Sequence, residues 1–158
     1  MAKQIVKTLT MLTLVVGLAL AVTIVSANGQ SASQRLTADI PFDFIVGDKT
    51  LPSGKYTVSA ATSNGEGVKL SHREGKSSAI RLSNIIVDKS ESRNARMVFH
   101  RYGQQYFLAE VWSGESYGRQ LIQSKRERNL KQELASNGSK SDLAKATYQI
   151  VEVVAMVR

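Results

Sequence analysis

The chain lacks cysteine and has only two histidines and two prolines among its 158 residues. Without cysteine there can be no disulfide, no thiolate nucleophile, no iron–sulfur cluster and no cysteine-type zinc site. His72 and His100 are the only imidazoles, so metal sites and catalytic triads built on histidine have little material. The sequence therefore predicts a protein that is not an enzyme and that has neither a cofactor nor a metal.

Positive charge is what the chain has in excess. It carries 21 Lys and Arg residues against 13 Asp and Glu residues, a formal charge of +8. A length of this order fits a single domain.

Residues 1–27 predict a secretory signal peptide. Lys3 and Lys7 precede an uncharged apolar run at 8–24, and a short stretch of small residues ends at Ala27. Cleavage after Ala27 leaves about 131 residues with a charge of about +6, located in the periplasm or the medium. The alternative is an uncleaved anchor, since the run approaches the length of about 17 residues that spans a bilayer. In that case this segment alone would contact the membrane.

The rest of the chain predicts a flexible start at 28–35 and a single β domain at 36–158. Apolar and polar residues alternate from Leu36 to Phe44, which is typical of a half-buried strand, and Pro41 places an edge or a bulge there. Further β-prone runs, each bounded by turn residues, follow at 56–60, 68–72, 79–87, 96–102, 106–112 and 147–157. The pattern predicts an antiparallel β-sandwich or a small β-barrel of about seven to eight strands, with the last strand central.

One segment near the C-terminus breaks the period of two. Ser124 can cap a helix with Glu127 three residues later, and Leu130 and Leu134 follow at helical spacing before Asn137-Gly138. We therefore expect one short helix here. Its cations are Lys125, Arg126, Arg128 and Lys131.

Three runs carry a family resemblance: residues 40–58 (IPFDFIVGDKTLPSGKYTV), 99–112 (FHRYGQQYFLAEVW) and 118–130 (GRQLIQSKRERNL). Together they resemble small exported proteins of unassigned function that are numerous in acidobacterial genomes. The resemblance covers most of the exported chain. It implies export but no activity.

Two motifs resemble catalytic motifs but lack the structural context that such motifs require. Residues 114–118 (GESYG) match the G-x-S-x-G nucleophile elbow, but both histidines precede Ser116 and a strand-like run follows it. The cluster Ser53-Gly54-Lys55 lacks the strand–loop–helix spacing of a phosphate loop. We interpret both as turns between strands.

A binding surface is the remaining functional hypothesis. Aromatic residues concentrate in the 102–117 region, where they could stack on a sugar or lipid or equally pack across the hairpin. The helix cations could attract an anionic lipid or polysaccharide of the envelope, or form a solvated face with Glu127 paired to Lys131. Export argues against nucleic acid as the partner. The candidate ligand-binding residues are Arg101, Tyr102, Tyr106, Trp112, Arg119 and Arg126; the alternative is an apolar ligand inside a small barrel.

Overall fold

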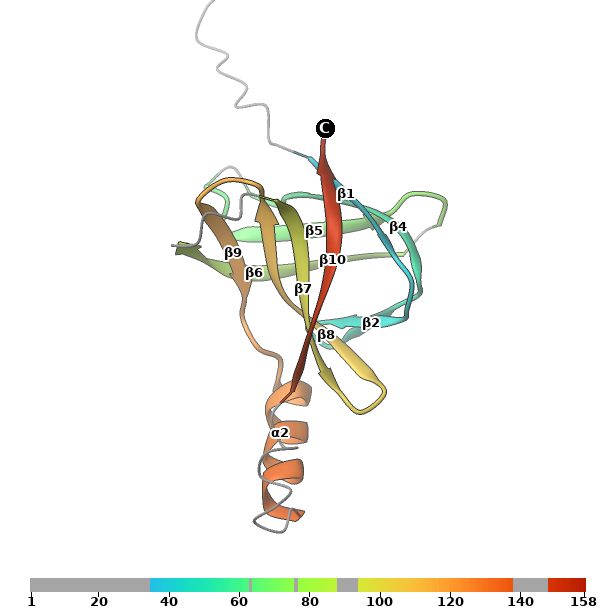
Figure 1. Cartoon of the computed structure of the whole chain (residues 1–158), viewed down its shortest axis with the longest axis vertical. Helices are drawn as coiled ribbons and strands as arrows, with labels where there is room; N and C mark the ends of the chain where they lie inside the picture. The colour runs from blue at the N-terminus through green and yellow to red at the C-terminus, as the bar shows by residue number, and fades with distance from the viewer. Residues whose placement is uncertain (1–34, 63, 76, 88–93, 138–147) are drawn as a thin grey trace, which may run out of the picture. The chain divides into compact units, whose positions relative to one another are not determined.

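The computed structural model describes residues 35–62, 64–75, 77–87, 94–137 and 148–158 (Figure 1). The predicted signal peptide at 1–27, and residues 28–34 of the predicted flexible start, lie outside the described residues. None of the described residues belongs to a helix long and apolar enough to cross a membrane. In chain order the elements are β1 (Leu36–Ile40), β2 (Phe44–Val46), β3 (Lys49–Leu51), β4 (Gly54–Ala60), β5 (Gly67–His72), β6 (Ser78–Val87), β7 (Ala95–Tyr102), β8 (Gln105–Ser113), β9 (Tyr117–Leu121), α2 (Lys125–Asn137) and β10 (Gln149–Val157).

Eight antiparallel strands close into a barrel. The hydrogen-bonded order runs β8-β7-β10-β1-β4-β5-β6-β9, and β9 also pairs with β8, which joins the two ends of the sheet. The prediction of a small barrel with one short helix is therefore confirmed over the sandwich. As predicted, the last strand is internal: β10 lies between β7 and β1.

The hairpin formed by β2 and β3 closes one end of the barrel, which we call the base. Phe44, Val46 and Leu51 from this hairpin are at most 2 % exposed and belong to the main core. β2 attaches to the barrel by parallel pairing of Ile45 with Phe107 of β8. The predicted strand from Leu36 to Phe44 is therefore two strands, because the chain leaves the barrel wall at Pro41 and turns underneath it.

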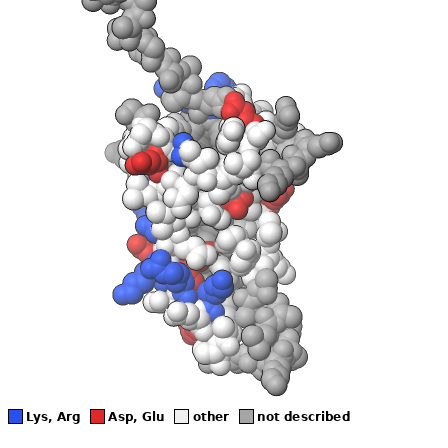
Figure 2. Space-filling view, turned by 90° about the vertical axis from the view of Figure 1, so that its left-hand side faces the viewer, with Lys and Arg blue, Asp and Glu red and all other residues white. Residues whose placement is uncertain are grey.

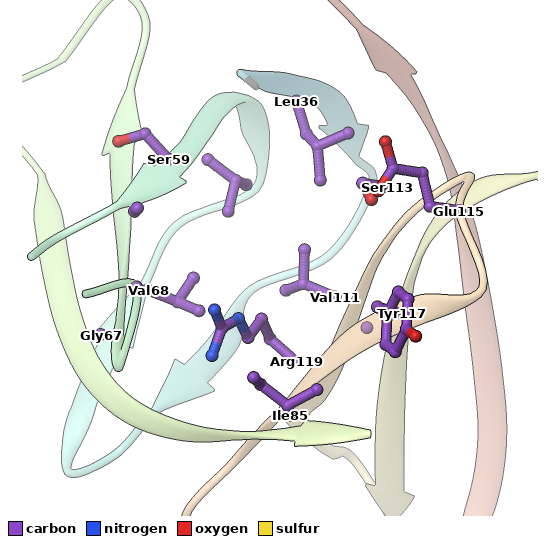
Figure 3. A pocket seen from close by; sticks show the side chains of 14 residues that line it. Leu36, Ser59, Gly67, Val68, Ile85, Val111, Ser113, Glu115, Tyr117 and Arg119 are labelled. Atoms are coloured by element: carbon purple, nitrogen blue, oxygen red, sulfur yellow. The ribbon is translucent and has the colours of Figure 1, made fainter. Parts of the chain in front are cut away.

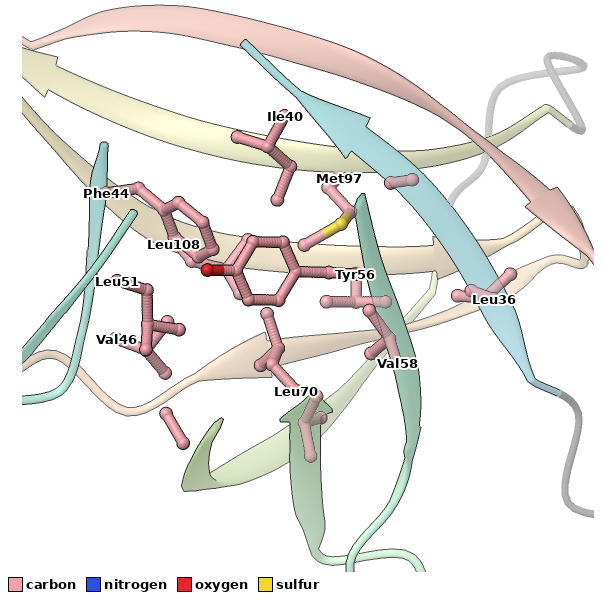
Figure 4. Packing of buried hydrophobic residues seen from close by; sticks show 14 of the residues in the cluster. Leu36, Ile40, Phe44, Val46, Leu51, Tyr56, Val58, Leu70, Met97 and Leu108 are labelled. Carbon is pink, nitrogen blue, oxygen red and sulfur yellow. The ribbon is translucent and has the colours of Figure 1, made fainter. Parts of the chain in front are cut away.

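Inward-facing side chains fill the middle of the barrel. Tyr56, Leu70, Met97 and Phe99 are fully buried there, and Tyr56 packs edge-on against Phe44 of the base hairpin (Figure 4). The Tyr56 hydroxyl donates to the Pro52 carbonyl at 2.7 Å, so its polar end is satisfied. Burial, with Asp43 nearby, raises the pKa of Tyr56. The middle of the barrel is therefore filled by side chains.

The helix α2 starts beyond the base, where the sequence places it. Ser124 is its N-cap, because the Glu127 amide donates to the Ser124 hydroxyl oxygen at 3.0 Å. From Lys131 onward the described side chains of the helix are exposed. The helix is thus held to the barrel by its first two turns.

Candidate functional site

The end of the barrel opposite the base holds a pocket of about 320 Å³, which we call the mouth pocket (Figure 3). This volume lies near the lower limit of the roughly 300–1,000 Å³ typical of small-molecule sites. The pocket lies between β4–β5 on one side and β6, β8 and β9 on the other. Its apolar walls are Leu36, Val58, Ala60, Val68, Ile85 and Val111.

Arg119 is the only cation among the described residues that line the mouth pocket. It sits on β9 opposite Ile85 of β6, and Figure 3 shows its side chain reaching across the pocket towards β4 and β5. Its guanidinium lies against Gly65, where a Cβ would come within 2.5 Å of Nη2. Gly65 also has a φ of 70°, so glycine is favoured there for two reasons. Within the described ranges the guanidinium has no hydrogen-bond or ion-pair partner.

Glu115 and Tyr117 lie at the rim of the mouth pocket and are exposed. Glu115 has an interaction of its own. Tyr117 pairs with Val87 of β6, and both are about 60 % exposed. The described part of the pocket therefore combines apolar walls, a rim that holds Glu115 and Tyr117, and a single inward-reaching cation.

Trp112 lies near the mouth but faces outward. Its ring packs flat on Gly118, where an added Cβ would be 2.5 Å from Cε3, and Arg96 covers it with Cζ 4.9 Å from the ring centroid. Its indole nitrogen donates to Glu110 at 2.8 Å, and the residue is only 5 % exposed. Trp112 thus packs on the barrel's outer face, separately from Arg119.

The other candidates lie at the base. The Tyr106 ring stacks on Phe42 with centroids 3.9 Å apart, and the Arg101 Cζ lies 5.4 Å from the Tyr106 centroid. Arg126 of α2 donates to the Gln105 side-chain oxygen at 2.8 Å. Tyr106 and Trp112 are six residues apart on β8, which corresponds to about 20 Å. The structure therefore does not bring the six candidates into one site.

Tyr102 belongs to a second small core outside the barrel, with Ile45, Phe107 and the partly buried Leu130 and Tyr148. Its hydroxyl is buried and makes no hydrogen bond of good geometry with the described residues, although the Glu127 carboxylate is close. Burial raises the pKa of Tyr102, and the Glu127 carboxylate raises it further. This tyrosine packs α2 and β10 against the hairpin.

Replacing Tyr102 with phenylalanine is expected to leave the free energy of unfolding unchanged or to raise it by up to about 1 kcal/mol, because a poorly paired buried hydroxyl is removed. The wild type should lose stability above pH 10, where a tyrosine with the ordinary pKa of 10.0 ionises in the unfolded chain while folded Tyr102 stays protonated. Urea denaturation at neutral and alkaline pH measures both effects. The phenylalanine variant should lose less stability at alkaline pH, whereas Tyr117→Phe at the exposed rim should behave as wild type; a destabilised Tyr102→Phe would contradict this assignment.

Glu127 points inward and is 4 % exposed. Its carboxylate lies 3.1 Å from His100 Nδ1 on the outer face of β7, and the His100 ring stacks on Tyr148 with centroids 3.7 Å apart. The alternative in which Glu127 pairs with Lys131 on a solvated face is wrong, because the acid is turned away from solvent. The start of α2 thus has a buried acid, while the cations around it stay exposed.

The structure also places the residues of the catalytic-looking motif and the remaining histidine. Ser116 is exposed in the turn between the antiparallel strands β8 and β9, a strand–turn–strand context unlike a nucleophile elbow. His72 packs edge-on against Tyr56, and its Nδ1 accepts from the Glu74 amide at 3.2 Å. In the part of the chain that the structure describes, no three His, Asp or Glu residues gather as a metal site would require.

A comparison with protein-family models finds no match, and comparisons with curated proteins and with solved structures find none either. The resemblance to exported acidobacterial proteins stays a prediction. Function must therefore be inferred from the sites themselves.

Proposed function

We propose that this protein is an exported binding protein, not an enzyme, and that its mouth pocket takes a small apolar molecule bearing one anionic group. The observation that carries the proposal is Arg119, a cation without a partner among the described residues that reaches into a pocket with apolar walls. A guanidinium binds a carboxylate through paired, charge-assisted hydrogen bonds, which are stronger than neutral ones. The apolar walls would bury the rest of the molecule.

Two features support a ligand site over a packing defect. The base hairpin and the buried core fill the barrel below the mouth pocket, so the pocket is bounded by packed side chains. Gly65 leaves the Arg119 guanidinium room to lie across the pocket. Export is supported by the n-region, apolar run and small-residue end of residues 1–27.

The test is titration calorimetry of the full chain with decanoate and with its neutral analogue decanol. Arg119→Gln should weaken decanoate binding by about ten- to a hundredfold, because a hydrogen bond to a charged group contributes about 1.5–3 kcal/mol. Decanol binding should change by less than about twofold, since the apolar walls are intact.

Arg73→Gln is the matched control, because Arg73 is exposed, lies outside the pocket and carries the same charge. It should bind both probes as wild type does. Ser113→Leu, which fills the pocket, should weaken both probes. Equal loss of decanoate affinity in Arg73→Gln and Arg119→Gln would contradict the proposal. So would a failure of both decanoate and decanol to bind the wild-type protein.

A further inference from the structure

We propose that a second site, on the outside of the barrel beside α2, binds an acidic polysaccharide. The site is a cleft of about 340 Å³ between the outer faces of β6–β9 and the start of α2, which we call the outer cleft. Its described lining is polar and apolar in part: Asn84, His100, Ala109, Gln120, Leu121, Ile122, Gln123, Glu127 and Arg128. The Glu127 carboxylate in this lining is paired with His100 at 3.1 Å. The outer cleft shares no described residue with the mouth pocket, so the inference stands independently of the proposed function.

The outer cleft is deep at Ala109, because the alanine side chain is small. The pairing of β7 with β8 shifts register between Val98 and Phe99, which leaves Ala109 as the extra residue between Glu110 and Leu108. A bulge re-aims the side chains around it, and alanine is the smallest side chain that could stand there apart from glycine. The hollow is therefore built into the strand pairing.

Two carboxamides stand at one side of the outer cleft. Asn84 and Gln120 are opposite each other on the paired strands β6 and β9, and both are exposed. Neither side-chain amide has a hydrogen-bond partner among the described residues. Each amide offers two donor hydrogens and an acceptor oxygen, which match the hydroxyl groups of a sugar ring. A surface that bound anions by charge alone would not need these neutral amides.

Cations continue from the outer cleft along the helix. Arg128 lines the cleft, and Lys125 and Lys131 stand three residues before and after it, which makes them neighbours on the helix surface. All three are exposed, and none forms an ion pair with a described carboxylate. Figure 2, which looks onto this side of the molecule, shows Lys and Arg gathered towards the helix end.

The inward turn of Glu127 is what leaves this row of cations without a carboxylate partner among the described residues. The acid that helical spacing would pair with Lys131 is held by His100 instead. A hollow with exposed amides at one side and a carboxylate already paired with His100 can accept a protruding neutral part of a sugar, whereas a flat bilayer would contact only the cations. The combination therefore favours a chain of acidic sugars, with one sugar in the cleft and carboxylates of its neighbours on the helix.

The test measures binding of the purified full chain to polygalacturonate at low ionic strength, with neutral dextran and phosphatidylglycerol vesicles as comparisons. We expect polygalacturonate to bind, to be released by salt, and to bind more tightly than the vesicles. The variant Lys125→Gln/Arg128→Gln/Lys131→Gln and the variant Asn84→Ala/Gln120→Ala should each weaken this binding by about tenfold or more.

Arg126→Gln is the matched control, because Arg126 lies on the other side of the helix against Gln105, and it should change binding by less than about twofold. Arg119→Gln should also bind as wild type, which separates this site from the mouth pocket. All these substitutions are at exposed or half-exposed positions, so each variant should fold, and circular dichroism checks this. If the variant Asn84→Ala/Gln120→Ala bound polygalacturonate with wild-type affinity, the outer cleft would not be part of the site. If the vesicles bound as tightly as polygalacturonate, the surface would be a membrane-binding surface instead. No binding to polygalacturonate would overturn the proposal altogether.

Discussion

Replacing Phe99 with alanine is expected to lower the free energy of unfolding by about 3–5 kcal/mol, the usual cost of removing a fully buried aromatic ring. Phe99 is 0 % exposed and joins the barrel wall to the base. Its ring meets Phe42 edge-on with centroids 5.2 Å apart and Phe44 edge-on at 5.5 Å. Truncation would leave a cavity between β7 and the base hairpin, which the close-packed core cannot fill without moving the hairpin.

Urea denaturation followed by circular dichroism measures this loss as a lower midpoint at an unchanged slope. Ile150→Ala is the matched control, because Ile150 lies on the outer face of β10 and is 63 % exposed. That variant should stay within about 0.5 kcal/mol of wild type. A loss below about 1 kcal/mol for Phe99→Ala would show that the base is not packed through this ring.

Replacing Glu127 with alanine is expected to cost about 1–3 kcal/mol, because His100 then keeps a buried ring nitrogen without its partner. The substitution should affect the attachment of α2 to the barrel more than the stability of the barrel itself. Glu127 and Ser124 are the buried polar residues that fix the start of α2, and Leu130 is the partly buried residue that follows them. With Glu127 removed, the helix should separate from the barrel more often than the barrel unfolds.

Hydrogen exchange of the α2 amides distinguishes these two effects. In Glu127→Ala the amides of α2 should exchange faster, whereas those of β4 and β5 should follow global stability only. Glu127→Gln keeps a hydrogen-bonding oxygen at the same place and should lose less. Glu133→Ala, at an exposed position of the same helix, serves as the control. Unchanged exchange in α2 would show that the contact with His100 does not hold the helix.

Strands such as β4 and β5 were predictable because one side of each faces the core. Alternation of apolar and polar residues places Tyr56, Val58, Leu70 and Met97 inward, and each is buried. The helix was predictable from Ser124 and the leucine spacing for a similar reason, since capping and periodicity are local. The capping pattern was only half right: Ser124 caps the helix, but the Glu127 side chain turns to His100 instead of back to the N-cap amide.

The base hairpin was not predictable from the same pattern. Leu36 to Phe44 alternates without a break, yet β1 ends at Ile40 and β2 begins a separate pairing with β3 and β8. Pro41 indicated an irregularity, but period-two alternation looks the same in a wall strand and in a strand that crosses the barrel end. Only packing against Phe99 and Tyr56 decides which of these forms.

Of the six residues that the sequence suggested for ligand binding, only Arg119 lies among the described residues that line the mouth pocket. Arg119 was identified for anion binding and lies in the mouth pocket, but its pocket neighbours Ala60, Gly65 and Ile85 were not. A signal was available in the glycines of the turn at 64–67, which permit close approach across the barrel end. Arg126 and Arg101 lie towards the base instead, because the register of β8 with β7 and β9 separates the two ends.

The sequence by itself determined the β class, the helix and the scarcity of reactive and metal-binding side chains. Composition and short-range periodicity can be read without knowing which distant residues meet. The lack of cysteine excludes crosslinks and thiol chemistry in any fold. Only the tertiary structure decided that the barrel closes through the pairing of β8 with β9, that one end is filled and the other hollow, and that Glu127 faces His100 and not Lys131. Each of these depends on contacts between residues far apart in the chain, whose relative positions no local pattern encodes.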